Sequence, residues 1–179
     1  MKGWFARERF SFITSSIILV GIIADQLTKL LTTLYLPKQF DSFYEDPLQV
    51  IPKFFFLVEH HNEGVAWSQF EGVFFVLYIV PIFALAMFFY LLYKGNLKTM
   101  KTYSIGLSLM IAGTIGNLLD RIFLGYVIDF LSFTFGTYVY PTFNLADSSL
   151  VIGVALFCID ILFLEPKRSQ KLKGLKNEL

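Results

Sequence analysis

Residues 104 to 130 read SIGLSLMIAGTIGNLLDRIFLGYVIDF, and they join a membrane-spanning pattern to a polar one. Six small residues dilute the apolar first part of this stretch: Ser104, Gly106, Ser108, Gly113, Thr114 and Gly116. Small residues let helices approach closely in lipid, because they leave room for a neighbouring backbone. We therefore expect a transmembrane helix at the centre of a helical bundle, ending in the polar sequence GNLLDR at residues 116 to 121.

The composition of the whole chain is typical of a membrane protein. Of its 179 residues, 55% are hydrophobic, 18% are aromatic and only 16% are charged. A soluble domain of this length rarely carries so much apolar surface, so a bilayer must cover the rest. The length favours one domain, residues 1–179, and the single cysteine excludes an intramolecular disulfide.

Four apolar runs are long enough to cross the hydrocarbon core, which takes about 20 helical residues. They lie at about residues 11–36, 73–93, 102–120 and 144–164. The apolar segment 122–143 is not expected to be a fifth span, because glycines, a proline and Asp129 interrupt it and backbone in lipid must be satisfied internally. The predicted fold class is an all-α membrane protein with four transmembrane helices and a small extracytoplasmic loop region that contains β-structure.

The distribution of basic residues predicts the orientation of these spans. With four spans, 11 of the 15 Lys and Arg residues fall on one side, in the N-terminal segment, the loop between spans two and three, and the tail 165–179. The positive-inside rule then places both termini in the cytoplasm. We expect the basic tail to be a poorly ordered end that could contact anionic lipid.

The loop 37–72 is the largest segment expected outside the membrane. Its segment Leu48 to Val58 is bulky and β-prone, which predicts one or two short strands at the interface. Residues 123–141 should pack on the same surface. We expect loop 37–72 to act as a flexible cover over a site, because its apolar residues need a lipid or peptide partner.

Two aspartates, Asp129 and Asp147, lie in polar sequences where spans three and four should leave the bilayer on the same side. A carboxylate in or beside hydrocarbon is costly unless it is paired, so such a position is a functional candidate. Asp147 falls in the first turn of the fourth helix, where an ordinary capping role is the alternative. Asp129 has apolar neighbours and no capping role. Two acids at matched depth indicate a pair that shares a proton and acts on water.

Other polar residues in these sequences allow more than one interpretation. Asp120 and Arg121 are adjacent at the end of the third span, and we expect them to form a structural clamp. Asn117 and Asn144 each stand three residues before an aspartate, so their amides could orient a carboxylate, bind a peptide carbonyl or bridge two helices.

Charged and histidine residues elsewhere give weaker predictions. Asp25 and Lys29 have the i, i+4 spacing of a helix-face ion pair, and the sequence leaves a structural and a substrate-facing role equally open. Asp160 should reach toward the inner interface. His60 and His61 lack the spacing of a metal motif, so no metal site is expected. No serine or cysteine nucleophile motif occurs either, which leaves aspartate chemistry.

Four short motifs occur in an order that resembles the lipoprotein signal peptidases, or signal peptidase II, membrane aspartyl peptidases of bacteria. They are DQLTK (25–29), HNEGVAW (61–67), GTIGNLLDR with GYVIDF (113–130) and YPTFNLADSS (140–149). The resemblance covers roughly residues 17–164. One departure is Val65, which stands where the family usually has alanine.

The resemblance implies that the catalytic pair is Asp129 and Asp147. It also implies a set of residues that bind substrate or support the site: Asp25, Asn62, Gly64, Gly113, Asn117, Asp120, Arg121 and Asn144. Lys29 joins this set as the i, i+4 partner of Asp25. The implied reaction is removal of the signal peptide from a prolipoprotein, by cleavage before its diacylglyceryl-modified cysteine. The active site would face the extracytoplasmic side of the bacterial cytoplasmic membrane.

The same resemblance implies membrane lipids as partners and a monomer, with no cofactor, metal or nucleic acid. A small proton-coupled transporter is the alternative function, since intramembrane carboxylates also bind ions. A transporter predicts acids near the bilayer middle and an internal repeat, whereas these two acids are expected at the outer edge and no repeat occurs. A non-catalytic membrane scaffold is a third interpretation.

Overall fold

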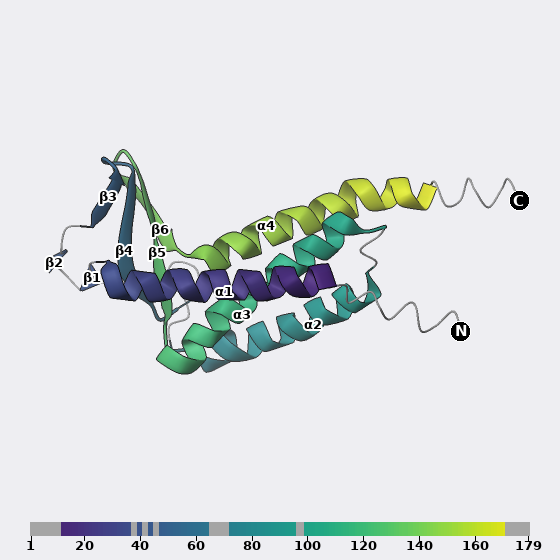
Figure 1. The fold of residues 1–179 in the computed structure, drawn as a ribbon, viewed down its shortest axis with the longest axis horizontal. Helices are drawn as coiled ribbons and strands as arrows, with labels where there is room; N and C mark the ends of the chain where they lie inside the picture. The colour runs from purple at the N-terminus through teal and green to yellow at the C-terminus, as the bar shows by residue number, and fades with distance from the viewer. Residues whose placement is uncertain are drawn as a thin grey trace, which may run out of the picture.

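The structure is a computed structural model, and it describes residues 12–36, 39–40, 43–44, 47–64, 72–95 and 99–170. Within these residues, four long helices extend from a small antiparallel sheet at one end of the molecule (Figure 1). The helical elements are α1 (Phe12–Tyr35), a π-helix η3 (Phe75–Ile79) that leads into α2 (Val80–Lys94), α3 (Lys101–Leu124) and α4 (Leu145–Ile159) with its π-helical continuation η4 (Asp160–Leu164).

The four predicted spans are confirmed as helices long and apolar enough to cross a membrane. Two of them run further than expected. The third ends at Leu124 rather than near residue 120, and the fourth stays helical to Gln170. The first six residues of the expected disordered tail are therefore helical, while residues 171–179 lie outside the described part of the chain.

Helix α3 is the central helix of the bundle, as its small residues predict. It packs against α1, α2 and α4. At Gly113 the backbone of α4 comes so close that a Cβ atom would collide with the carbonyl oxygen of Ala146. At Gly116 a Cβ atom would lie 2.5 Å from the Asp25 carboxylate. These glycines bring α1 and α4 close to α3 where its polar sequence begins.

The sheet contains four strands in the order β3-β4-β5-β6, all antiparallel. Their bounds are β3 (Leu48–Ile51), β4 (Phe55–Asn62), β5 (Val127–Phe135) and β6 (Tyr138–Phe143); a separate short pair is formed by β1 (Gln39–Phe40) and β2 (Phe43–Tyr44). The register pairs Phe55 with Phe133 and His60 with Asp129. The sheet is larger than the one or two strands expected, because segment 122–143 contributes two strands of its own.

The connections of the sheet explain how a polar site is built at this end of the bundle. Helix α3 ends at Leu124, the next residue, Gly125, has a left-handed φ of 87°, and β5 starts two residues after it. Strand β6 runs directly into α4 at Asn144. Figure 1 places the start of α1 and the end of α4 at the opposite end of the bundle from the sheet. The prediction that segment 122–143 is not a fifth span is thus confirmed, because after the end of α3 at Leu124 it forms β5 and β6.

Parts of loop 37–72 lie outside the described residues, namely 37–38, 41–42, 45–46 and 65–71. The expected cover over the site falls partly on these residues and stays a prediction.

Candidate active site

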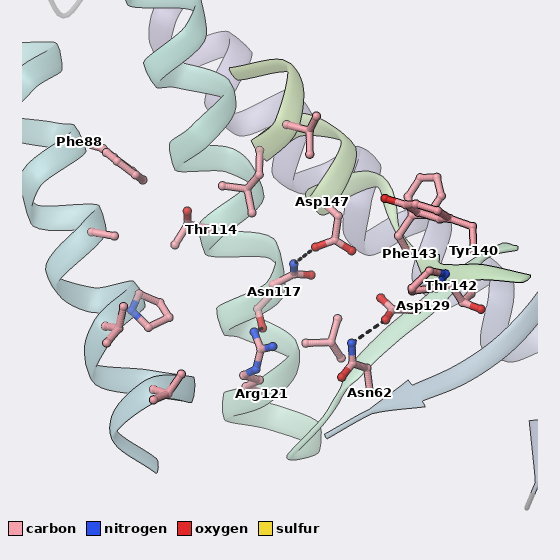
Figure 2. A pocket seen from close by; sticks show the side chains of 18 residues that line it. Asn62, Phe88, Thr114, Asn117, Arg121, Asp129, Tyr140, Thr142, Phe143 and Asp147 are labelled. Atoms are coloured by element: carbon pink, nitrogen blue, oxygen red, sulfur yellow. Dashed lines mark hydrogen bonds between the residues drawn. The ribbon is translucent and has the colours of Figure 1, made fainter. Parts of the chain in front are cut away.

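Asp129 and Asp147 line the same cavity, although 18 residues separate them in sequence. Asp129 lies on β5, and Asp147 lies in the first turn of α4. The cavity has a volume of about 530 Å³, and Asn62, Asn117 and Arg121 also line it. Figure 2 shows the two aspartate side chains pointing toward one another. Asp129 is only 1% exposed.

Asp147 caps α4, which is the alternative role that the sequence left open, and it also lines the cavity. Its carboxylate accepts a hydrogen bond from the backbone N–H of Asn144 at 3.1 Å, and its own N–H donates to the Asn144 side chain at 2.9 Å. This reciprocal pair is a capping box. The cap fixes the position of the Asp147 carboxylate at a helix N-terminus, where the backbone favours negative charge.

Three asparagine amides hold the two carboxylates. The Asn117 side chain donates to Asp147 at 2.7 Å. The Asn144 side chain donates to Asp129 at 2.7 Å and to the side-chain amide oxygen of Asn117 at 3.0 Å. Asn62 donates to the other oxygen of Asp129 at 2.9 Å. Each aspartate therefore has an oxygen fixed by an amide. Of the roles that the sequence left open for Asn117 and Asn144, the structure shows that both hold a carboxylate, and their own hydrogen bond also bridges α3 and the start of α4.

A buried charge cluster lies behind these amides and comprises Lys29, Asp25 and Asp120. The Lys29 ammonium is 2.9 Å from an oxygen of each of the two aspartates, and it donates to the Asn117 amide oxygen at 3.0 Å. Lys29 is 2% exposed, and neither Lys29 nor Asp25 lines the cavity. The structure thus favours the structural role that the sequence left level with a substrate-facing one.

Asp25 also fixes the start of α4. Its second oxygen accepts a hydrogen bond from the backbone N–H of Ala146 at 2.9 Å. A single lysine thereby links α1 and α3, while its aspartate partner ties both to the helix that carries Asp147.

The expected clamp between Asp120 and Arg121 is wrong. Asp120 pairs with Lys29 and accepts from the backbone N–H of Ile128 at 3.1 Å, whereas Arg121 donates to the carbonyl oxygen of Gly64 at 2.7 Å. Adjacent residues on a helix point in different directions, so they do not face each other. The helix also continues for another turn, which leaves both side chains within the bundle rather than at its end.

The two predicted glycines, Gly64 and Gly113, act through their backbone. Gly64 accepts from Arg121, and its N–H donates to the Asn62 side chain at 3.0 Å, which holds that amide near Asp129. Gly113 allows α4 to approach α3, as described above. All predicted site residues therefore come together at one end of the bundle, in the cavity wall or directly behind it.

Several residues at the site were missed by sequence reasoning. Gln26 donates to Asp120 at 2.8 Å and belongs to the DQLTK sequence, where a second polar side chain inside an apolar run was an available signal. The apolar cavity wall comes largely from α2 and from the segment before α4: Val76, Val80, Pro81, Ala84, Phe88, Tyr140, Pro141 and Phe143. Nothing in their spacing distinguishes them from lipid-facing residues.

The surroundings of Asp129 change its protonation. Burial, and next the negative charge of Asp147, raise the pKa of Asp129 to about 7, although hydrogen bonds from Asn62 and Asn144 oppose the shift. Near neutral pH the two aspartates can therefore hold one proton between them. One charged and one protonated carboxyl group facing a cavity can act as a general base and a general acid.

Two further polar predictions concern Asp160 and the histidines. Asp160 does not reach toward the interface; it is 0% exposed and forms two hydrogen bonds with Arg168, at 2.9 and 2.5 Å. The reason is that α4 continues beyond residue 164, so Asp160 lies inside the helix. His61 contacts Glu59 at 2.6 Å, and no group of three or more metal-binding side chains occurs in the described ranges.

Comparisons with known proteins agree with this arrangement. Residues 17–163 match the family model of signal peptidase II. Lipoprotein signal peptidases of Bacillus pumilus and Enterococcus faecalis are 39% and 41% identical, covering 87% and 90% of this chain and 95% and 93% of their own lengths. Two solved structures described as a bacterial membrane enzyme have TM-scores of 0.70, at 33% and 32% identity. Both cover 84% of this chain, and they are covered over 87% and 93% of their own lengths.

Fold and site together define a multi-span membrane protein with a buried polar centre at one end of its helices. The chain belongs to the signal peptidase II family. It is accordingly a bacterial membrane protein of a peptidase family, and the suspected resemblance is confirmed.

Proposed function

We propose that this protein is a lipoprotein signal peptidase of the aspartyl type. It removes the signal peptide from diacylglyceryl-modified prolipoproteins by cleaving before the lipidated cysteine. The observation that carries this proposal is the pair Asp129 and Asp147, which face one cavity from a strand and a helix. Family membership supports the substrate class.

In the proposed mechanism the two aspartates divide acid and base work. Asp147 is the ionised partner, because the N-terminus of α4 stabilises its charge. Asp129 carries the shared proton, because burial favours its neutral form. Asp147 takes a proton from water as the water oxygen attacks the peptide carbonyl, and Asp129 donates its proton to the developing oxyanion.

Collapse of the tetrahedral intermediate returns the dyad to its starting state. The C–N bond breaks, the leaving amine takes the proton that Asp147 received from water, and the hydroxyl proton of the intermediate goes back to Asp129. The products are the free carboxyl end of the signal peptide and the amine of the lipidated cysteine, so no proton is gained or lost by the pair.

The remaining site residues support this chemistry. Asn117, Asn144 and Asn62 keep the carboxylates in place. Lys29, with Asp25 and Asp120, anchors Asn117 and the start of α4. Arg121 and Gly64 hold the segment that carries Asn62, and Gly113 permits the close packing of α4.

The membrane position of the site follows from the same proposal. The chain acts as a single domain, residues 1–179, and as a monomer in the cytoplasmic membrane, with both termini in the cytoplasm and the cavity facing the extracytoplasmic side. Cavity walls from α2 and α4 are mostly apolar, which suits a signal peptide that arrives from lipid. Lipids and the prolipoprotein are its partners; no metal, cofactor or nucleic acid is needed. The transporter alternative is not favoured, because the family is one of peptidases.

A direct test compares a lipidated with an unlipidated precursor of the same sequence. Purified protein in detergent or liposomes should release the signal peptide from the lipidated form only, as measured by mass spectrometry. Equal processing of both forms would contradict the substrate assignment. Uptake of a solute without any proteolysis would favour a carrier instead.

A further inference from the structure

Strand β6 is an edge strand beside the candidate active site. The sheet order ends with β6, and among the described residues β5 is the only strand that pairs with it. An edge strand presents backbone N–H and C=O groups that another extended chain can pair with. Such an edge is a potential binding surface if it faces the right space.

The cavity borders the end of β6 that leads into α4. Four consecutive residues of this segment, 140 to 143, line the cavity, and Figure 2 shows Tyr140, Thr142 and Phe143 next to Asp129. The pairing of β5 with β6 is irregular between Leu131 and Phe133, which interrupts the alternation of side chains between the two faces of β6. The cavity therefore borders all four of the last residues of β6, next to its unpaired edge.

This edge leads directly to the two aspartates. Phe143, the last residue of β6, precedes Asn144, which donates to Asp129 at 2.7 Å and caps the helix that carries Asp147. A chain paired with β6 would therefore pass over the aspartates as it leaves the strand. Pro141 cannot donate a backbone hydrogen bond and is tolerated in edge strands, which agrees with an edge that stays open in the free protein.

Hydrolysis itself creates a need for such a surface. The carbonyl group of a peptide bond in a helix accepts an internal hydrogen bond, so a signal peptide must become extended around the bond to be cleaved. Extension frees backbone N–H and C=O groups in a place with little water, where unsatisfied groups are costly. A strand edge provides partners for these groups without requiring any particular side chains.

We propose that the substrate segment around the scissile bond binds as an added strand along the free edge of β6. This inference rests on the proposed peptidase function and adds the binding mode. Every second backbone N–H of the bound segment donates to β6, while the others point away. Backbone pairing explains how one enzyme can accept signal peptides of different sequence in the same register.

The test uses a lipidated precursor peptide in which single backbone N–H groups near the scissile bond are N-methylated in turn. Binding is measured by competition against the unmodified peptide on the full-length Asp129→Asn protein, which should bind without cleaving. Since only the peptide changes, folding of the protein does not enter. We expect methylation to weaken binding about tenfold at alternate positions and little at those between. Infrared spectra of the peptide with ¹³C-labelled carbonyls should show the amide shift of a paired strand.

The possible outcomes separate the binding mode from the function. If the wild-type protein cleaves the parent peptide but methylation has no effect, or has equal effects at every position, the β6 proposal is wrong and the function stands. A helical amide signal for the bound segment would overturn the proposal as well. If the parent peptide is not cleaved at all, the proposed function fails, and the binding mode fails with it.

Discussion

Two clusters of buried charge lie at opposite ends of the helical bundle, and their construction differs. At the sheet end, Lys29 contacts Asp25, Asp120 and Asn117, which joins α1 to α3 and reaches the amide that holds Asp147. At the other end, Asp160 pairs with Arg168 within a single helix. The first cluster crosses between helices and reaches the site; the second is local.

The two clusters also differ in how far their cations are exposed. Lys29 is 2% exposed, and it is the cation that both Asp25 and Asp120 contact, so its loss would leave two buried carboxylates without a counter-charge. The Arg168 side chain is 25% exposed and can find water if Asp160 changes. A buried ion pair is weak evidence for stability by itself, but removing one partner leaves an unpaired charge. We infer that the cluster of Lys29, Asp25 and Asp120 positions the catalytic pair. The pair Asp160 and Arg168 only neutralises a charge within one helix.

The largest expected effect is on catalysis. Asp129→Asn and Asp147→Asn should each lower the rate of cleavage on the order of a thousandfold, because each removes one proton-transfer group. Initial rates with a fluorescent lipopeptide would measure this. Asp160→Asn is the matched control, since it makes the same chemical change at the other end. An Asn variant of either dyad residue that kept wild-type turnover would exclude the aspartyl mechanism.

Lys29→Met tests the connected cluster. It leaves Asp25 and Asp120 buried without their cation, which should destabilise the protein by roughly 3–5 kcal/mol and loosen Asn117. Thermal unfolding in detergent and cleavage rates below the unfolding temperature give the two readouts. Wild-type stability together with wild-type rates would show that the cluster neither holds the fold nor positions the dyad.

The stability of the Asp129→Asn variant should depend on pH. The folded state favours neutral Asp129, so wild-type stability falls as the pH rises from the ordinary carboxyl pKa of 3.8 to about 7. Asparagine does not ionise and escapes this loss. The stability of the variant should therefore rise relative to that of the wild type between about pH 4 and 7, by up to roughly 4 kcal/mol at about 1.4 kcal/mol per pKa unit. A difference in unfolding temperature that stays constant over this range would argue against the raised pKa.

A smaller change is expected when one hydrogen bond to the dyad is removed. The activity of the wild type should fall as the pH rises above about 7, because the pair then loses its shared proton. Asn62 donates to the ionised form of Asp129 and lowers its pKa, so Asn62→Ala should raise that pKa and move the alkaline limb to higher pH. Rate profiles from pH 5 to 9 would show the shift. A shift of the alkaline limb to lower pH would contradict this prediction.

The smallest effect is expected at the isolated pair. Asp160→Asn keeps a hydrogen-bonding side chain and frees a partly exposed arginine, so it should cost about 1 kcal/mol of stability and leave cleavage near wild type. Unfolding curves and rates of the same preparation test both statements. A large loss of activity would mean that the two ends of the bundle are coupled, and the contrast between them would disappear.

Much of the fold could be predicted from the sequence, because its signals are local. The four spans follow from hydropathy, and the central place of α3 follows from its small residues. Gly125, Gly136 and Pro141 were sufficient to exclude segment 122–143 as a fifth span. The strand pairing could not, since the register of β4 against β5 depends on contacts between residues about 70 positions apart.

The site was predictable as a set of residues but not as a network. Two acids in polar sequences at the ends of adjacent spans indicated the pair Asp129 and Asp147. The predicted pairing of Asp120 with Arg121 was wrong, because the partner of a side chain depends on how its helix is rotated in the bundle. Adjacency in sequence does not reveal this rotation. The environment of Asp160 was wrong because the end of α4 was placed too early.

The central claim is that Asp129 and Asp147 share one proton near neutral pH, and infrared difference titration of the carboxyl groups tests it most directly. We predict the band of a protonated carboxyl group at pH 6 that disappears toward pH 8, is absent from Asp129→Asn and persists in Asp160→Asn. Loss of the band already below pH 5, or its survival unchanged in Asp129→Asn, would contradict the account.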